Sequence, residues 1–319
     1  MKTVILLPLE EQAIKTINDI AKDRCKVVFK TVETVTSEDV SDADAVLGNL
    51  PPRLLRDTKK LKWLQISMAG TDAYLGGILP NGVTLTNVTG AFGLAISEHM
   101  VATVFTLYKK LHLYRDNQNK AQWLDRGQVK QIEGATVLTV GLGDIGGNFA
   151  KKMKALGAYT IGVRRKDTSK PDYIDELILQ NDLDKVLPRA DIVALALPNT
   201  AETKGLFNRE RIYRMKDGAT LINVGRGNAV ETEALCDALE NGKLYAASLD
   251  VTDPEPLPSD HRLWKLENAL ITPHISGFFH LRKTYENIVD IFIENFSRFL
   301  DGKELENIID MTTGYRRKP

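Results

Sequence analysis

The sequence predicts an α/β protein with two domains, each built on a doubly wound parallel sheet. Three observations lead to this prediction. Short apolar runs rich in β-branched residues alternate with stretches of helical period, which is the pattern of parallel β–α units. The alternation occurs in two series, separated by one long helical stretch at 97–120. The 319 residues are enough for two domains with substantial cores.

Each element of the two series is predicted from its own local pattern. Helices are expected at 10–23 and at 281–300, where "LRKTYENIVDIFIENFSRFL" is amphipathic. The strands of the first series are expected at 3–7, 26–30, 45–47, 61–67 and 83–86, and those of the second at 136–140, 159–163, 192–196, 220–224, 246–250 and 269–272. With two domains, the cleft between them is the default place for a ligand.

Composition and charge exclude several classes of function. Apolar residues make up 43% and charged residues 26% of the chain, and the formal net charge is zero. These values predict a soluble globular protein without a nucleic-acid or membrane partner. Cys25 and Cys236 are too few for a disulfide framework or a metal site, so we expect no metal and a cytoplasmic location. The apolar start at 1–9 is expected to be a strand and not a signal sequence.

A glycine-rich loop follows the first strand of the second series. "TVLTVGLGDIGGNFAKKMKALG" places Gly141, Gly143 and Gly146 in G-x-G-x-x-G spacing, between a strand and an apolar-faced helix. Such a loop makes a tight turn, admits a pyrophosphate close to the backbone and presents it to the helix N-terminus. The loop is therefore predicted to bind a dinucleotide, with Asp144 and Ile145 at the start of the helix.

A basic run ends the next strand, in "AYTIGVRRKDTSKP". In a dinucleotide-binding fold this strand end meets the adenosine ribose, and a carboxylate there binds the 2′-hydroxyl. Here the position holds Arg164, followed by Arg165 and Lys166. Arginine binds a 2′-phosphate through charge-assisted hydrogen bonds, whereas a carboxylate repels it. We therefore expect NADP(H) to be preferred, with NAD(H) as the alternative cofactor.

Three later strand ends carry side chains suited to acid–base chemistry. "LINVGRGNAV" presents Arg226, "AASLDVTDPEPLP" presents Asp250 and Glu255, and "ALITPHISG" presents His274. The carboxyl ends of strands are where an open parallel sheet places its ligands. The other four histidines have no comparable setting and receive no role.

These stretches together resemble one known family. In their order and spacing, "GLGDIGG", "NVGRG", "DVTDPEPLP" and "TPHISG" resemble the D-isomer-specific 2-hydroxyacid dehydrogenases, as do "SMAGTD" at 67–72 and "LPNTAETKGLFN" at 197–208. The resemblance covers nearly the whole chain. It implies two Rossmann-like or flavodoxin-like domains around a central cleft, and reduction of a 2-keto acid to a D-2-hydroxy acid.

The resemblance also implies a role for each site residue. Arg226 would pair with the substrate carboxylate, His274 would protonate the keto oxygen, and Glu255 would stabilise the imidazolium of His274. Backbone N–H groups of Met68, Ala69 and Gly70 would bind the substrate carboxylate, and Asp250 would contact the nicotinamide carboxamide. The remaining cofactor contacts would come from Leu197, Pro198, Thr203, Val224, Gly225, His274 and Gly277.

The family pattern further implies a discontinuous domain and a dimer. We expect residues 1–97 with 288–319 to form the substrate-binding domain and 98–287 the NAD(P)-binding domain. Residues around 98–130 would extend to the partner of a homodimer. The chain departs from the commoner pattern at two places: Arg164 at the ribose position argues against NAD, and Phe278–Phe279 after the histidine leave the keto acid open.

Several functions remain as alternatives at this stage. Within enzymes these are a glyoxylate/hydroxypyruvate reductase and a short phosphoglycerate dehydrogenase, with formate dehydrogenase disfavoured by length. Outside enzymes, a cofactor-sensing scaffold of the corepressor kind is the rival. The short sequence after the last helical pattern favours the enzyme over that scaffold.

Overall fold

Two compact units make up the chain in the computed structural model, which describes residues 1–165 and 169–317. Unit 1 comprises Met1–Ala91 and Phe279–Pro319, and unit 2 comprises Phe92–Phe278. Both changes of unit occur earlier in the chain than we expected, after Ala91 and after Phe278. The reason is that the first helix of unit 2 already begins at Gly93, and the last helix of the chain begins at Arg282.

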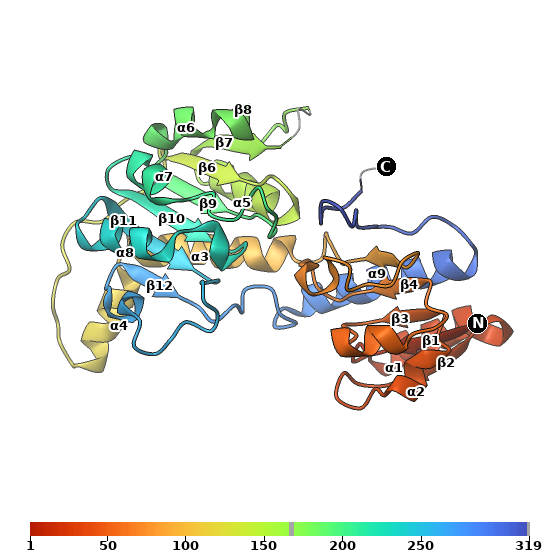
Figure 1. Ribbon diagram of the computed structural model, residues 1–319. Helices are drawn as coiled ribbons and strands as arrows, with labels where there is room; N and C mark the ends of the chain where they lie inside the picture. Colours follow the sequence, from red (N-terminus) through yellow and green to blue (C-terminus); the bar gives the residue numbers. More distant parts are fainter. Residues whose placement is uncertain (166–168, 318–319) are drawn as a thin grey trace. The chain divides into compact units, whose positions relative to one another are not determined.

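Unit 1 is a five-stranded parallel sheet with the order β2-β1-β3-β4-β5 (Figure 1). Its strands are short and mostly buried, which suits β-branched and aliphatic residues with helices on the sheet faces. The elements are β1 (Lys2–Ile5), α1 (Glu11–Ala21), β2 (Lys26–Phe29), α2 (Ser37–Ser41), β3 (Ala45–Leu47), β4 (Trp63–Gln65), β5 (Thr84–Thr86) and α9 (Arg282–Leu300).

Helix α9 returns to unit 1 from the far end of the sequence. Its apolar stripe buries Ile288, Phe292 and Phe296, as the amphipathic pattern predicts. The amide of Asn295, fully buried, donates to the side-chain oxygen of Gln65 in β4 at 2.7 Å. A satisfied buried polar contact of this kind fixes the register of a helix on a sheet. The C-terminal helix is therefore part of the core of unit 1, although it is distant in the sequence.

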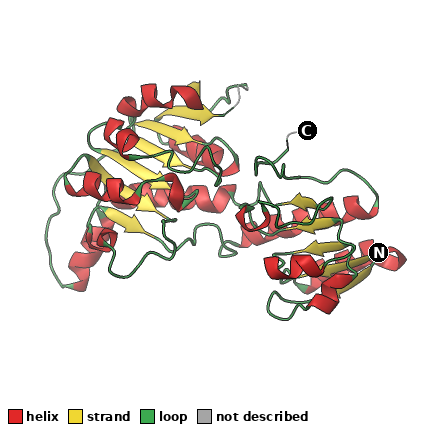
Figure 2. Ribbon diagram, in the orientation of Figure 1, coloured by secondary structure: helices red, strands yellow, loops and turns green. Residues whose placement is uncertain are grey.

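Unit 2 is a seven-stranded parallel sheet with the order β12-β11-β10-β9-β6-β7-β8. From β6 to β11, α-helices lie between most successive strands (Figure 2). The elements are α3 (Gly93–Tyr108), α4 (Leu111–Asn119), β6 (Thr136–Val140), α5 (Asp144–Ala155), β7 (Tyr159–Arg164), β8 (Glu176–Leu179), α6 (Leu183–Val186), β9 (Ile192–Leu195), α7 (Arg209–Arg214), β10 (Ala219–Asn223), α8 (Thr232–Glu240), β11 (Leu244–Leu249) and β12 (Ala269–Ile271).

Helices cover both faces of this second sheet. Leu138 and Val140 of β6 join one core cluster with residues of α6, α7 and α8. Thr139 points the other way, because a Cβ on Gly146 of α5 would lie 3.0 Å from the Cγ2 of Thr139. The sheet is therefore doubly wound, as predicted. Strand order reverses at β6, which lies between β7 and β9, and such a switch point is where these sheets bind ligands.

Two local expectations were wrong. The stretch 97–120 is two helices, α3 and α4, because Lys110 adopts a left-handed backbone with φ of 55° between them. The apolar α3 packs against α5, whereas α4 is more polar. The two helices therefore do not share one buried face along 97–120. The edge strand β8 was not predicted, since its four residues are too short a run to stand out from a loop.

Candidate active site

One edge of the unit 2 sheet collects the residues singled out in its sequence. Because all strands are parallel, the segments after their carboxyl ends lie at the same edge. Six consecutive strand ends contribute: Gly141 follows β6, Arg164 ends β7, Leu197 follows β9, Arg226 follows β10, Asp250 follows β11 and His274 follows β12. Each of these residues therefore lies at the end of a strand, as the sequence predicts, and its role stays a prediction.

The glycine-rich loop leads into α5 as expected. Gly143 precedes the helix, and no side chain caps its N-terminus. The first helical hydrogen bond runs from the N–H of Gly147 to the carbonyl of Gly143 at 2.9 Å. The N–H groups of Asp144, Ile145 and Gly146 precede that bond and lie at the positive end of the helix dipole, where an anion is stabilised.

Packing explains two of the three glycines in the loop. A Cβ on Gly146 would lie 2.0 Å from the carbonyl oxygen of Gly141, and one on Gly141, whose φ is 96°, would lie 2.5 Å from that of Ala196. A Cβ on Gly143 would meet no atom within 4 Å. Two glycines thus serve the close approach of backbone segments, and the third borders open space. This cradle fits a dinucleotide pyrophosphate.

The basic run continues directly from β7. Arg164 is the last strand residue, and its Nη1 lies 3.5 Å from the carbonyl oxygen of Ser169. Arg165 is exposed, with its Nη1 3.6 Å from a carboxylate oxygen of Glu202. Lys166 lies outside the described residues. Arg164 therefore ends the strand that follows the glycine-rich loop, at the position where this fold meets the ribose.

A histidine and a carboxylate meet between two neighbouring loops. The Nδ1 of His274 lies 2.6 Å from the Oε1 of Glu255, and both side chains are about half exposed. His274 has a left-handed backbone, with φ of 53°, which is unusual for a residue with a side chain. Its N–H donates to the carbonyl oxygen of Asp250 at 2.8 Å, which anchors this conformation.

A buried asparagine shapes the loop that carries Arg226. Asn223, the last residue of β10, accepts from the N–H of Gly225 at 3.0 Å and donates to the carbonyl of Arg226 at 2.9 Å. The Nη1 of Arg226 donates to the carbonyl of Gly225 at 2.8 Å. A Cβ on Gly227 would lie 1.9 Å from the carbonyl oxygen of Thr252, so this loop touches the one that leads to Glu255.

The remaining expected cofactor contacts fall into two groups. Leu197 and Pro198 follow β9, and a Cβ on Gly225 would lie 2.6 Å from the carbonyl oxygen of Leu197, so these two loops also touch. Thr203 is buried and donates its hydroxyl to the carbonyl of Pro198 at 2.7 Å, which braces the loop. Val224 and Gly277 are placed by packing, Val224 buried and Gly277 beside Ile96 of α3.

The expected substrate loop of unit 1 follows β4. Among the hydrogen bonds of the described residues, none uses the N–H of Met68, Ala69 or Gly70. Asn87 donates to the carbonyl of Ala69 at 2.8 Å, and the N–H of Ser67 donates to the side chain of Asn49 at 3.0 Å. Consecutive N–H groups without a protein acceptor form a setting for an anion.

Four polar residues with structural importance for these loops were missed from the sequence. They are Asn49, Asn87, Asn223 and Thr272, and each binds the backbone or side chain of a residue near the site. The available signal was a single polar residue at the end of an apolar strand, as in "LINV". A lone asparagine is too common at strand ends for this signal to be used on its own.

Two other kinds of site were looked for among the described residues. No group of three or more histidine, cysteine or acidic side chains there is arranged to hold a metal ion. No described helix is both long and apolar enough to cross a membrane.

A dinucleotide cradle with an arginine and a histidine–carboxylate pair at adjoining strand ends is typical of NAD(P)-dependent dehydrogenases. Residues 101–276 match the model of the NAD-binding domain of D-isomer-specific 2-hydroxyacid dehydrogenases. The chain belongs to this family, which confirms the resemblance of its motifs. It is an oxidoreductase of the NAD(P)-dependent type that acts on CH–OH donors.

Three relatives illustrate the similarity. A putative 2-hydroxyacid dehydrogenase from Haemophilus influenzae is 33% identical over 76% of this chain and 80% of its own. A family protein from Aeromonas salmonicida has a solved structure with a TM-score of 0.86 and 32% identity, over 97% of this chain and 99% of its own. An NADPH-dependent glyoxylate/hydroxypyruvate reductase from Sinorhizobium meliloti, solved with NADP and sulfate, has a TM-score of 0.82 and 25% identity, over 98% and 99%.

Proposed function

We propose that the protein is an NADPH-preferring reductase that converts a 2-keto acid into a D-2-hydroxy acid. The observation that carries the proposal is the contact of 2.6 Å between His274 and Glu255, at the sheet edge that also holds Arg226. A carboxylate only accepts hydrogen bonds, so the Nδ1–H of His274 donates to Glu255 and its Nε2 is left to carry the proton that moves. Reduction of a carbonyl requires such a proton at the new hydroxyl.

Each side chain then has a distinct task. When bound, the nicotinamide cofactor supplies the hydride for the keto carbon. His274 donates the Nε2 proton to the keto oxygen, and Glu255 stabilises the imidazolium before that donation. Arg226 pairs with the substrate carboxylate and polarises the keto oxygen, because its fork of N–H donors matches a carboxylate.

The cofactor preference is proposed from the end of β7. Arg164 occupies the strand end where an acidic residue would bind the ribose of NAD. The similar reductase from Sinorhizobium meliloti is described as NADPH-dependent, which is compatible with the same choice here. NAD(H) remains the weaker cofactor in this proposal. The cradle of Gly141, Gly143 and Gly146 serves either one, since it binds the pyrophosphate.

We propose a small 2-keto acid as the substrate class. Met68, Ala69 and Gly70 offer three N–H groups without an acceptor among the described residues, which supports binding of a carboxylate by unit 1. Unit 1 would be the substrate-binding domain and unit 2 the cofactor-binding domain. Glyoxylate and hydroxypyruvate come first in a test panel because the similar reductase from Sinorhizobium meliloti is named for both.

A steady-state assay of NADPH and NADH oxidation tests the proposal. The panel contains glyoxylate, hydroxypyruvate, pyruvate, branched 2-keto acids and 3-phosphohydroxypyruvate. We expect turnover of at least one keto acid with a higher kcat/KM for NADPH than for NADH. Binding of NADPH without turnover of any keto acid would contradict the proposal and favour the cofactor-sensing scaffold.

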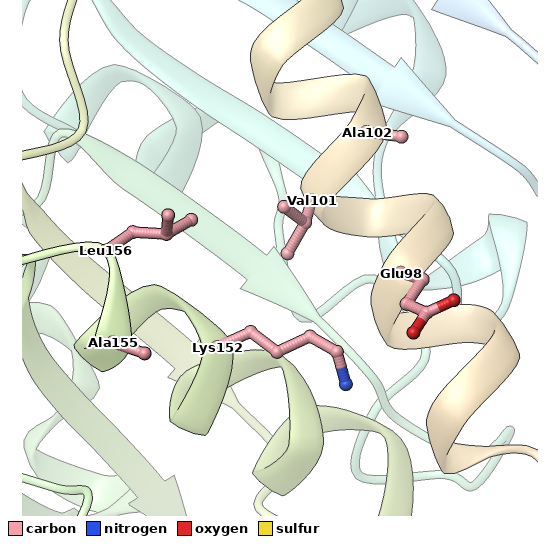
Figure 3. Close-up of a pocket in the computed structure, with 6 residues that line it drawn as sticks. All are labelled: Glu98, Val101, Ala102, Lys152, Ala155 and Leu156. Atoms are coloured by element: carbon pink, nitrogen blue, oxygen red, sulfur yellow. The ribbon is translucent and has the colours of Figure 1, made fainter.

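We also propose a homodimer formed through unit 2. Residues 120–131 run as an irregular segment from α4 to β6, drawn in yellow (Figure 1), and large apolar side chains on α4 and this segment are exposed: Leu111, Trp123, Leu124 and Val129. An open apolar groove lies between α3 and α5, lined by Val101, Ala102, Ala155 and Leu156 with Glu98 and Lys152 beside it (Figure 3). Exposed apolar patches of this kind mark association surfaces.

Light scattering after size exclusion tests the dimer. The wild type is expected at twice the chain mass, and Trp123→Arg at a lower mass or in exchange between the two forms. A monomeric wild type at micromolar concentration would contradict the proposal.

We further propose a cytoplasmic location. Cys25 and Cys236 are both buried and free of disulfides, which suits a reducing compartment.

A further inference from the structure

The segment that follows α9 forms a hairpin along one edge of the unit 1 sheet. Strand β5 lies at that edge, and Ile308 pairs with Thr86 of β5 in an antiparallel bridge. The N–H of Ile309 donates to a carbonyl of β5 at 2.9 Å, and the side chain of Ile309 joins the core of the unit. The chain then turns back, and Arg316 pairs with Ile309. This hairpin, residues 307–317, covers the sheet edge and is fixed against it.

Asn307 begins the hairpin and binds the loop that follows β5 at two points. Its carbonyl accepts from the N–H of Asn87 at 3.3 Å, and its side-chain amide donates to the carbonyl of Thr89 at 2.9 Å. Its side-chain oxygen accepts from the Nη1 of Arg316 at 2.9 Å. The backbone of Asn307 is left-handed, with φ of 57°, a conformation that asparagine adopts more readily than most residues. The hairpin therefore holds the loop at 87–89 in place.

Asn87 connects this loop to the expected substrate loop after β4. Its side chain is buried. Its side-chain oxygen accepts from the N–H of Thr89 at 3.1 Å, and its amide donates to the carbonyl of Ala69 at 2.8 Å. The N–H of Val88 lies 3.4 Å from the carbonyl oxygen of Met68. Two consecutive carbonyls of the substrate loop therefore face the loop that follows β5.

These two carbonyl contacts determine where two N–H groups of the substrate loop point. In a trans peptide, as both of these are, the C=O of one residue and the N–H of the next point in opposite directions. The N–H of Ala69 therefore points away from Val88, and that of Gly70 points away from Asn87. Neither N–H has an acceptor among the described residues. Two consecutive N–H groups are thus left to a ligand, which suits an anion.

We propose that Asn87 is a positioning residue for the substrate carboxylate, and that Asn307 of the hairpin holds Asn87 in place. The inference rests on the proposed function, in which the loop at 68–70 binds a carboxylate. It adds the means by which that loop keeps its N–H groups available. The amide of Asn87 holds the carbonyl of Ala69, and this commits the N–H of Gly70 to the ligand. Neither asparagine contacts the keto acid itself.

Asn87→Asp tests the first half of the inference, because it keeps the size of the side chain and replaces the donor by an acceptor. A carboxylate cannot bind the carbonyl of Ala69 but can accept from the N–H of Gly70, so the peptide between these two residues is expected to turn over. The substrate then loses a donor and meets a negative charge. We expect the KM for a keto acid to rise roughly tenfold or more and the Kd for NADPH to stay within about twofold.

Asn307→Gly tests the contribution of the hairpin. Glycine adopts the left-handed backbone without strain and keeps the carbonyl, so only the side-chain amide is lost. We expect the KM to rise about threefold, the order expected from one neutral hydrogen bond, and to rise no further when the substitution is added to Asn87→Asp. Thr312→Ala is the matched control, since Thr312 is exposed at the turn of the same hairpin, and its KM should equal that of the wild type.

Two further measurements separate positioning from general damage to the fold. Partial unfolding would reduce the amount of active protein and with it the apparent kcat, whereas the KM of the folded fraction would not change. Oxalate, a small carboxylate ligand that is not a keto acid, is titrated into the protein at saturating NADPH by calorimetry. Its Kd is expected to rise in Asn87→Asp in parallel with the KM. A crystal structure of Asn87→Asp is expected to show the carbonyl of Ala69 turned away from residue 87.

Several results would overturn the inference. An Asn87→Asp variant with the KM and oxalate Kd of the wild type would show that Asn87 does not position the loop, as would an unmoved carbonyl of Ala69. An equal rise in KM from Asn307→Gly in the wild-type and Asn87→Asp backgrounds would show that Asn307 does not act through Asn87. A wild type that fails to bind oxalate would exclude the anion site itself. A wild type that binds oxalate but reduces no keto acid would instead count against the proposed function alone.

Discussion

His274 and Glu255 link the loops that follow β12 and β11, with 2.6 Å between Nδ1 and Oε1. The link fixes both the tautomer and the orientation of the imidazole, because the carboxylate can only accept. The histidine is therefore prepared to exchange a proton at Nε2 alone. Its backbone φ of 53° shows that the protein maintains an unfavourable conformation to place the ring there.

Removal of the proton donor is the first prediction. His274→Gln keeps a polar side chain of similar length but cannot supply the proton. We expect kcat to fall by roughly two to four orders of magnitude, the usual contribution of general acid catalysis, while the Kd for NADPH stays unchanged. Stopped-flow reduction at saturating substrate measures the loss. A kcat near that of the wild type would contradict the proposed role of His274 as the proton donor.

Arg226 is expected to leave a different kinetic signature. Its proposed partner, the substrate carboxylate, is present before and during the reaction, so Arg226→Gln should raise KM as well as lower kcat. Arg226→Lys retains the charge and loses the paired N–H donors, and we expect it to fall between the wild type and the glutamine variant. Steady-state kinetics on one keto acid measure both parameters. An effect on kcat alone would show that Arg226 does not bind the substrate carboxylate in the ground state.

The cofactor preference can be tested at the end of β7. Arg164→Asp replaces a cation by the carboxylate that suits a ribose hydroxyl, so kcat/KM should fall for NADPH and rise for NADH. A charge-assisted hydrogen bond contributes about 1.5–3 kcal/mol, which corresponds to a shift of roughly one to two orders of magnitude. Arg165→Ala is the neighbouring control, with a smaller expected effect because Arg165 lies close to Glu202. Equal kcat/KM values for both cofactors in the wild type would refute the preference.

The sequence predicted the positions of the site residues better than the contacts within the loops that carry them. Strand ends are predictable, because a parallel sheet aligns them, and this placed Arg226, Asp250 and His274 at one edge. The hydrogen bonds of Asp250 were not predictable, since its four donors lie on a segment 22 to 26 residues further along the chain. The break at Lys110 was missed because periodicity does not register one left-handed residue between two helices.

Substitution by alanine should affect two glycines of the cradle differently: one in the stability of the protein, the other in the binding of NADPH. Gly146→Ala would place a Cβ 2.0 Å from the carbonyl oxygen of Gly141, so we expect a loss of about 1–3 kcal/mol in the free energy of unfolding. Gly143→Ala meets no atom within 4 Å and has φ of −80°, so its stability should be unchanged. It should instead weaken NADPH binding, because the methyl group enters the space proposed for the pyrophosphate. Thermal melts with and without NADPH measure both effects, and a stable Gly146→Ala variant would contradict the packing argument.

The last prediction concerns acid stability in unit 2. Arg211 of α7 binds Asp184 of α6 through two N–H donors, at 2.8 and 3.3 Å. The hydrogen bonds from Arg211 hold the pKa of Asp184 below its ordinary value of 3.8. A carboxyl whose pKa is lowered by folding adds stability above its unfolded pKa, and this stability is lost as pH falls through the folded pKa. Asp184→Asn should therefore cost less than about 1 kcal/mol at neutral pH, since the pair is partly exposed, and nothing once the wild-type carboxyl is protonated.

Urea unfolding of the wild type and Asp184→Asn at several pH values from about 7 to about 2 measures this convergence. Arg211→Met provides the control, because without the arginine the substitution at Asp184 should have little effect at any pH. The same difference between wild type and Asp184→Asn at neutral and acidic pH would show that the ion pair does not contribute. Convergence that persisted in the Arg211→Met background would assign the effect to a partner of Asp184 other than Arg211.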